Sequence, residues 1–157
     1  MSVKTNAMRA LDQRKVEYEI HEYSSEIHSA VEAAQAMDRP PECVYKTLVV
    51  MREAPRAKPL LVMVPGDCEL DLRMLAKSTG DKKLRMATQK EAESLTGLLV
   101  GGIGALALLN RGFEIWIDSA AKAHERICVN AGQRGINLEL RVDDLMKVTG
   151  ARWVESA

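Results

Sequence analysis

Residues 44–50 read VYKTLVV and residues 59–65 read PLLVMVP, two aliphatic runs separated by the turn-forming segment EAPRAKP at 53–59. This spacing predicts two adjacent antiparallel strands joined by a hairpin-like connection. Side chains alternate along a strand, so Lys46 shares one face of the first run with Val44, Leu48 and Val50. Because an unpaired buried charge is costly, Lys46 either reaches water at the start of the strand or meets an anionic group in a cleft.

Helices are predicted on both sides of this strand pair. Apolar spacing and capping residues place them near residues 8–11 and over 31–37, 70–80, 88–97 and 142–150. Ser29 and Thr88 are followed three residues later by glutamate, which is the spacing of a capping box. The last helix is expected to begin at Asp143 or Asp144.

Four further strands are expected, over 16–23, 113–119, 125–132 and 136–141. In the first of them, Val16, Tyr18 and Ile20 alternate with polar residues and should form the buried face. Strands at hairpin spacing with helices outside them predict a single α+β domain over 1–157. Its central sheet should be mixed, mostly antiparallel and barrel-like, with helices flanking it.

Composition limits the functional classes. The 157 residues are 46% hydrophobic and 28% charged, with no apolar run near the roughly 20 residues that span a bilayer. The first ten residues also lack the charged-then-apolar order of a signal peptide, so we expect a cytoplasmic protein. The 22 basic and 22 acidic side chains cancel, which predicts weak binding to free nucleic acid.

A balanced total charge leaves open whether part of the surface is basic. Lys82, Lys83 and Arg85 form one cluster, and Arg52, Arg56 and Lys58 form another. A solvated face is the simpler interpretation of each cluster, and an anion-binding surface is the alternative.

Motifs for metals, cofactors and covalent catalysis are absent. The three cysteines form no CxxC pair, and the three histidines show no metal-binding spacing such as HExxH, so we expect no metal. No Walker loop or dinucleotide fingerprint is present, and no cofactor is expected. The segment GGIGA at 101–105 is either a tight turn or a loop whose N–H groups stabilise negative charge on an oxygen.

The order of the segments resembles the YbaK/EbsC family of prolyl-tRNA-synthetase-associated, aminoacyl-tRNA deacylase domains. The resemblance covers about residues 6–150. It rests on VYKTLVV, LLVMVPGD, LDLRMLAKSTGDKKLRMAT, EAESLTGLLVGGI, FEIWIDSA and VNAGQRGINLELRVDDLMKVTGA. It implies a YbaK-like fold and hydrolysis of the ester between a wrong amino acid and the terminal adenosine of a tRNA.

The resemblance also implies the site residues. The lysine of the KTL motif falls on Lys46, which would hold the adenosine or polarise the ester, and Gly101 and Gly102 match the paired glycines that line the cleft. Tyr23 falls where relatives carry a pocket tyrosine. Further expected substrate contacts are Thr47, Ile103, Gly104, Asn130 and Gly132. Water, or a nucleophile within the substrate, would attack the ester.

Two departures from the family pattern leave alternatives open. Gly104-Ala105 stands where relatives commonly have Ser-Pro or Thr-Pro after the glycines, and Asn130 replaces the serine of a VSAG pattern. The leading hypothesis is an enzyme that edits mischarged tRNA in trans, with tRNA(Pro) and prolyl-tRNA synthetase as candidate partners. The alternatives are a non-catalytic module that binds tRNA or a synthetase, and a hydrolase of another small ester.

Overall fold

The computed structural model describes residues 4–53 and 57–157. Five α-helices lie in this part of the chain: α1 (Asn6–Gln13), α2 (Ala30–Met37), α3 (Leu72–Thr79), α4 (Gln89–Thr96) and α5 (Val142–Thr149). Its strands are β1 (Glu19–Glu22), β2 (Val44–Arg52), β3 (Leu60–Pro65), β4 (Leu84–Met86), β5 (Glu114–Asp118), β6 (Arg126–Asn130), β7 (Ile136–Arg141) and β8 (Arg152–Val154). Three short 3-10 helices, η1 (Pro41–Cys43), η2 (Ala105–Leu108) and η3 (Ser119–Ala123), connect them.

Strands β2 and β3 form the centre of the sheet, as the opening runs predict. They pair antiparallel from Tyr45 opposite Pro65 to Val50 opposite Leu60. All six residues of β3 are buried, because side chains of the domain cover both faces of this strand. Part of the predicted turn, residues 54–56, lies outside the described residues.

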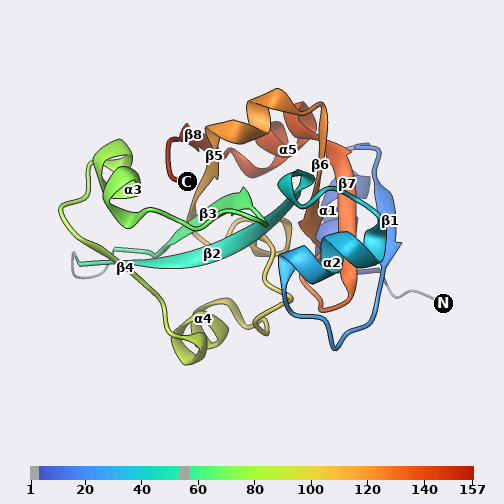
Figure 1. The fold of residues 1–157 in the computed structure, drawn as a ribbon, viewed down its shortest axis with the longest axis horizontal. Coiled ribbons are helices and arrows are strands. Elements are labelled where there is room, and N and C mark those ends of the chain that lie inside the picture. The colour runs from blue at the N-terminus through green and yellow to red at the C-terminus, as the bar shows by residue number, and fades with distance from the viewer. Residues whose placement is uncertain (1–3, 54–56) are drawn as a thin grey trace.

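The eight strands form one mixed sheet in the order β1-β7-β6-β2-β3-β5-β8, with β4 paired to β2 (Figure 1). Four of the pairings are antiparallel and three are parallel, so the predicted mixed, mostly antiparallel sheet is confirmed. Within the described residues, β1 and β8 form two unpaired ends. The sheet is therefore open, and the barrel-like expectation is corrected to an open sheet.

Packing on the two faces of β2 follows the alternation of its side chains. Tyr45 and Val49 join the larger core with α1, η2 and α5, whereas Val50 packs with Leu75 of α3 and Trp116 of β5. Helix α2 covers a third apolar cluster near the start of β2. Figure 1 shows α3, α4 and β4 toward one end of the molecule, with α1, α2 and β1 toward the other.

Local capping signals place most helix ends correctly. Thr88 and Glu91 form the complete predicted capping box at α4, and Gly97 ends that helix in a left-handed conformation. Ser29 caps α2 by accepting a hydrogen bond from the Glu32 N–H. None of the helices in the described ranges combines the length and apolar character needed to cross a membrane.

Two local expectations were wrong. Helix α5 begins at Val142 after the N-cap residue Arg141, so Asp143 and Asp144 lie within its first turn, where they favourably face the helix dipole. Ile20 is 45% exposed. It pairs with the fully buried Leu138, but β1 is an edge strand, with no further strand on its outer side in the described part of the chain.

Candidate active site

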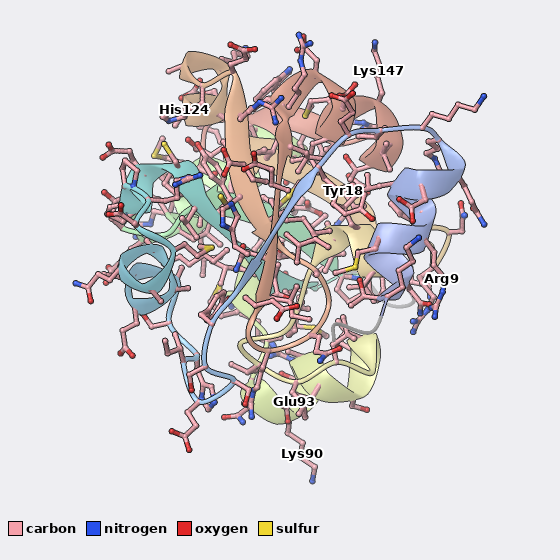
Figure 2. All side chains as sticks on the ribbon, turned by 90° about the vertical axis from the view of Figure 1, so that its right-hand side faces the viewer. Arg9, Tyr18, Lys90, Glu93, His124 and Lys147 are labelled. Atoms are coloured by element: carbon pink, nitrogen blue, oxygen red, sulfur yellow. The ribbon has the colours of Figure 1, made fainter. Side chains whose placement is uncertain are left out.

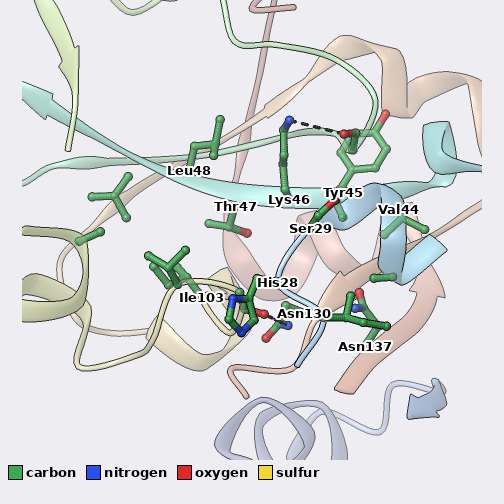
Figure 3. A pocket seen from close by; sticks show the side chains of 18 of the residues that line it. His28, Ser29, Val44, Tyr45, Lys46, Thr47, Leu48, Ile103, Asn130 and Asn137 are labelled. Carbon is green, nitrogen blue, oxygen red and sulfur yellow. Dashed lines mark hydrogen bonds between the residues drawn. The ribbon is translucent and has the colours of Figure 1, made fainter. Parts of the chain in front are cut away.

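A break in strand pairing beside β2 creates the main pocket. On this side, β6 pairs with β2 only at Val44 and Tyr45, and β4 pairs only from Val50 onward. The edge of β2 between these points faces a pocket of about 480 Å³, which lies within the range of small-ligand sites. The same residues that form the predicted KTL motif therefore lie at an interruption of the sheet (Figure 3).

Thr47 offers unsatisfied polar groups at this break. Its side chain is 9% exposed, and its hydroxyl has no hydrogen-bond partner in the described part of the chain. The Val49 carbonyl accepts from the Ala87 N–H, away from β3. Backbone direction alternates along an antiparallel strand, so the N–H and C=O of Thr47 point to this same side, where neither β4 nor β6 pairs with them. Buried polar groups normally have hydrogen-bond partners, so we expect a ligand to supply the partners that Thr47 lacks.

Lys46 projects from the opposite face of β2 and also lines the pocket. Its side chain is half-buried, and its ammonium donates to the Gly66 carbonyl at 3.5 Å (Figure 3). No carboxylate forms an ion pair with it among the described residues. The aliphatic stem thus packs along the strand while a cation with spare hydrogen-bond donors stands at the pocket.

Two loops form the wall opposite β2. The Asn130 side chain donates to the Gly101 carbonyl at 3.0 Å, and its oxygen accepts from the N–H groups of Gly132 at 2.7 Å and Gln133 at 3.0 Å. The Arg134 Nε donates to the Val100 carbonyl at 2.7 Å. Asn130 lines the pocket, but both ends of its amide are engaged in holding the two loops together.

The glycines of these loops permit an unusually close approach. A Cβ at Gly104 would lie 2.3 Å from the Asn130 carbonyl oxygen, and one at Gly102 would lie 2.7 Å from the backbone nitrogen of Arg134. A Cβ at Gly132 would lie 2.5 Å from the Ala107 Cβ. Glycine at these three positions therefore allows the two loops to pack against each other. This close packing is what we expect if GGIGA is a tight turn.

The inner end of the pocket carries a buried polar pair. Asn137 of β7 donates to the Tyr23 hydroxyl at 2.6 Å, while the other amide atom of Asn137, its oxygen, has no partner in the described residues. Burial raises the pKa of Tyr23 despite hydrogen bonds from Asn137 and Asn130, so the phenol stays neutral and can donate. Asn137 is only 3% exposed, so we expect a bound ligand to donate a hydrogen bond to its buried side-chain oxygen.

The structure brings most of the sequence-predicted residues together. Those that line the pocket are Tyr23, Lys46, Thr47, Gly101, Ile103 and Asn130. Those that lie behind the lining are Gly102, Gly104 and Gly132. The Gly102 N–H already donates to the Leu99 carbonyl at 2.7 Å, whereas the N–H groups of Gly101 and Ile103 make no hydrogen bond within the described part of the chain.

Sequence reasoning missed Asn137, Tyr45 and His28 as lining residues. No sequence signal pointed to Asn137, because alternation in INLELR places it on the same face as Glu139 and Arg141, a pattern typical of the solvent-facing side of a strand. Ala105 is 2% exposed and belongs to the main core. Ala105 therefore packs in the core and does not line the pocket.

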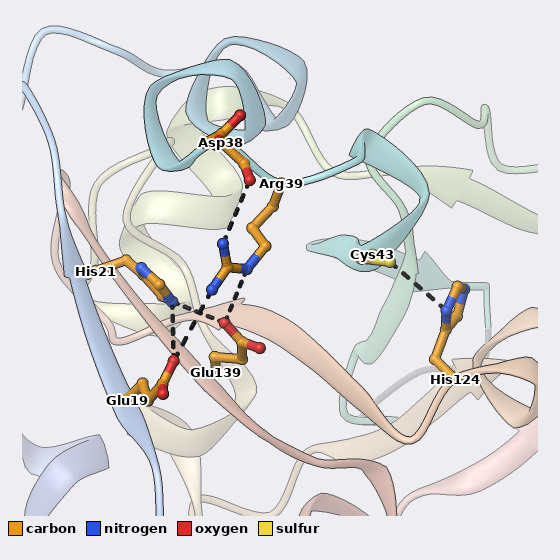
Figure 4. A network of polar contacts seen from close by, with 7 residues as sticks. All are labelled: Glu19, His21, Asp38, Arg39, Cys43, His124 and Glu139. Atoms are coloured by element: carbon orange, nitrogen blue, oxygen red, sulfur yellow. Dashed lines mark hydrogen bonds and ion pairs between the residues drawn. The ribbon is translucent and has the colours of Figure 1, made fainter.

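A separate polar network surrounds Glu139 of β7 (Figure 4), and one of its members, His21, pairs with Asn137 across β1 and β7. Glu139 accepts from the His21 Nε2 at 2.8 Å and from the Arg39 Nε at 3.1 Å. Burial alone would raise the pKa of Glu139, but these two donors outweigh it and lower the pKa. Possible ligand atoms of His21, Cys128 and Glu139 lie within 4.8 Å of one another, yet the Arg39 guanidinium already occupies the carboxylate, which disfavours a metal cation there.

The cysteines are poorly suited to act as nucleophiles. Burial raises the pKa of Cys43 and of Cys68, and it raises the pKa of Cys128 to about 12. The Cys43 Sγ lies 3.6 Å from the Nδ1 of His124, a contact that the sequence did not predict. None of the three thiols lines the pocket, so they are separate from the site built on β2.

Comparison with known proteins agrees with this geometry. A family model for the aminoacyl-tRNA editing domain matches residues 24–148. The sequence is 34% identical over 154 residues to EbsC of Enterococcus faecalis, which is named as a proposed Cys-tRNA(Pro)/Cys-tRNA(Cys) deacylase; the match covers 97% of this chain and 92% of EbsC. A 98-residue stretch is 30% identical to the proline–tRNA ligase of Aquifex aeolicus, covering 62% of this chain and 17% of the ligase.

Solved structures extend the comparison. A proposed trans-editing enzyme for prolyl-tRNA synthetase superposes with a TM-score of 0.81 at 25% identity, covering 99% of this chain and 98% of that chain. The hypothetical protein APE2540 has the same fold, with a TM-score of 0.86 at 22% identity over 96% of this chain and 98% of its own. The fold and site define an editing-domain architecture. The chain belongs to the aminoacyl-tRNA editing domain family, which confirms the resemblance to YbaK/EbsC proteins.

Proposed function

We propose that this protein is an aminoacyl-tRNA deacylase that acts in trans, removing a small, wrongly attached amino acid from tRNA, with tRNA(Pro) as the leading candidate. The observation that carries the proposal is the pocket at the break beside β2, where Lys46 and the unpartnered hydroxyl of Thr47 flank one interrupted strand edge. Family membership and the similarity to EbsC support the choice of reaction.

The chemistry needs positioning more than a strong nucleophile. An aminoacyl ester is already activated, so binding it beside a water molecule, or beside a nucleophile of its own side chain, can supply much of the rate. The Lys46 ammonium holds a hydroxyl or phosphate of the terminal adenosine or polarises the ester carbonyl. The N–H groups of Gly101 and Ile103, which make no hydrogen bond within the described residues, are backbone donors for the developing oxyanion.

Polar atoms at the inner end orient the amino acid. The unpartnered oxygen of Asn137 and the hydroxyl of Thr47 are suited to accept from the α-ammonium group of the substrate. Apolar lining from Ile103 and Val100 leaves room for a short side chain. A small pocket excludes bulky side chains by steric overlap, so we expect Ala, Ser and Cys to be accepted.

The partner and the location follow from the same proposal. The match to a proline–tRNA ligase supports prolyl-tRNA synthetase as the enzyme whose errors are corrected. Mischarged tRNA made by a cytoplasmic synthetase would meet this protein in the cytoplasm. The proposed reaction requires neither a metal nor a cofactor.

The test is deacylation of Ala-, Ser-, Cys- and Pro-tRNA(Pro) with protein at a small fraction of the substrate concentration. We expect many turnovers on at least one mischarged tRNA and far slower loss of proline. Tight binding without turnover on the whole panel would replace the proposal with a non-catalytic tRNA-binding module. Turnover only of small esters unconnected to tRNA would indicate another hydrolase.

A further inference from the structure

One side of the pocket mouth is formed by β4 and the start of α4. Met86, Ala87 and Gln89 line the pocket, and Met86 is 40% exposed, so this segment runs from the protein surface to the edge of the site. Lys83 precedes Met86 by three residues, which corresponds to about 10 Å along extended chain. Lys90 directly follows Gln89.

The lysines of this segment are free while its acids are engaged. Lys82, Lys83 and Lys90 are exposed and form no ion pair within the described residues. Asp81 pairs with Arg52 at 3.2 Å, and Glu91 pairs with Arg85 at 2.7 Å. We call Lys82, Lys83 and Lys90 the basic rim.

The opposite side of the mouth has no comparable lysine cluster in the described part of the chain. His28, Ser29 and Ala30, at the start of α2, line the pocket there. Glu26 and Glu32 are exposed nearby in sequence, and no ion pair neutralises them in the described part of the chain. Arg134 lies beside Gly101 and His28 and partly offsets these acids, so a polyanion approaching the pocket is attracted most strongly over β4 and the start of α4.

We propose that the basic rim binds the phosphates at the aminoacyl end of the tRNA, so that the acceptor strand crosses β4 and the start of α4 as its terminal adenosine enters the pocket. This inference rests on the proposed function, because that function makes the ligand an RNA. In a chain with zero net charge, the asymmetry fixes the direction of approach more than it adds overall affinity.

The experiment compares two variants with equal loss of charge. The rim variant carries Lys82→Gln, Lys83→Gln and Lys90→Gln. The control variant carries Lys15→Gln, Arg141→Gln and Lys147→Gln, which are also exposed. Figure 2 shows Lys147 and Lys90 at opposite ends of the molecule, and neither set contains a residue that lines the pocket.

The first readout is binding of uncharged tRNA(Pro), measured by fluorescence anisotropy at several salt concentrations. Each phosphate contact to a single strand contributes about 0.7 to the slope of log Kd against log salt, so loss of three contacts should flatten the slope by about two. The control variant should keep the wild-type slope. The second readout is turnover of alanyl-adenosine, which has no phosphate chain, and the rim variant should match wild type.

Several results would overturn the proposal. Equal flattening in both variants would mean that only net charge matters, and an unchanged slope in the rim variant would place the RNA elsewhere. An effect that appears only when prolyl-tRNA synthetase is present would assign the rim to a protein partner. If wild type hydrolyses no ester but the rim variant still loses the salt-dependent binding, the proposed reaction fails while the RNA surface stands.

Discussion

Replacing Gly104 with alanine should disrupt the contact between the two pocket loops. The backbone of Gly104 is extended, with φ −141° and ψ 137°, so alanine adopts it without strain. The new Cβ would, however, lie 2.3 Å from the Asn130 carbonyl oxygen and 3.0 Å from its carbonyl carbon. Both are backbone atoms, and Asn130 is held in β6 and by its side-chain hydrogen bonds.

The expected cost follows from this rigidity. Overpacking a well-packed site costs about 1–3 kcal/mol, and a clash with backbone that cannot yield belongs at the upper end. For a domain of about this size, 3 kcal/mol lowers Tm by roughly 6–12 °C. Thermal unfolding followed by circular dichroism, with urea unfolding as a second measurement, provides the assay.

Gly97→Ala is the matched control. Gly97 has φ +74°, but a Cβ there would meet nothing within 4 Å, so the substitution carries only the left-handed backbone cost of about 1–2 kcal/mol. Gly104→Ala should therefore destabilise more than Gly97→Ala. If Gly104→Ala shifts Tm by no more than its control does, the two loops are not packed as described and the close-approach reasoning fails.

Three further outcomes are expected. Thr47→Val should leave Tm unchanged or raise it, because it removes a buried hydroxyl without a partner, while deacylation falls; a lowered Tm with full activity would contradict this role. Hydrogen bonds, first of all from Arg85, lower the pKa of Glu91 to about 2, so the stability from this pair is present above the ordinary pKa near 4.5 and disappears as pH falls toward 2. Glu91→Gln should therefore flatten the dependence of the urea midpoint on pH across that window, and an unchanged dependence would refute the pairing. A variant with all three cysteines replaced by alanine should fold and keep its turnover, whereas a folded but inactive variant would indicate a thiol nucleophile.

Local signals in the sequence predict the elements of this fold well. The β2–β3 hairpin and the capping box at Thr88 depend on residues close in the chain, so the pattern contains the information needed. The short strands β4 and β8, three residues each, were not predicted, because their pairing with β2 and β5 comes from distant parts of the chain. Ile20 shows the same limit, since its exposure depends on where β1 falls in the sheet.

The sequence identified several residues of the candidate site, but it did not predict how they are arranged. Strand alternation singled out Lys46, and family resemblance supplied the loop glycines. The break beside β2 could not be foreseen, because it arises where parallel pairing with β6 stops and antiparallel pairing with β4 has not begun. Thr47 faces a pocket because of that break. Gly102 and Gly104 contribute to packing, because a Cβ at either position would clash with the neighbouring loop.

The central claim is that Lys46 is a functional side chain of a deacylase. The most direct test compares wild type with a folded Lys46→Ala variant on the mischarged tRNA that wild type hydrolyses fastest. Removal of one preorganised polar group that acts on the transition state typically costs about 10²–10³ in rate. We predict a loss of kcat/KM in that range with Tm nearly unchanged, because the one hydrogen bond that the ammonium makes to the described residues is the long one to the Gly66 carbonyl, at 3.5 Å. A variant that keeps wild-type turnover would contradict the account and make Lys46 a half-buried strand residue without a catalytic role.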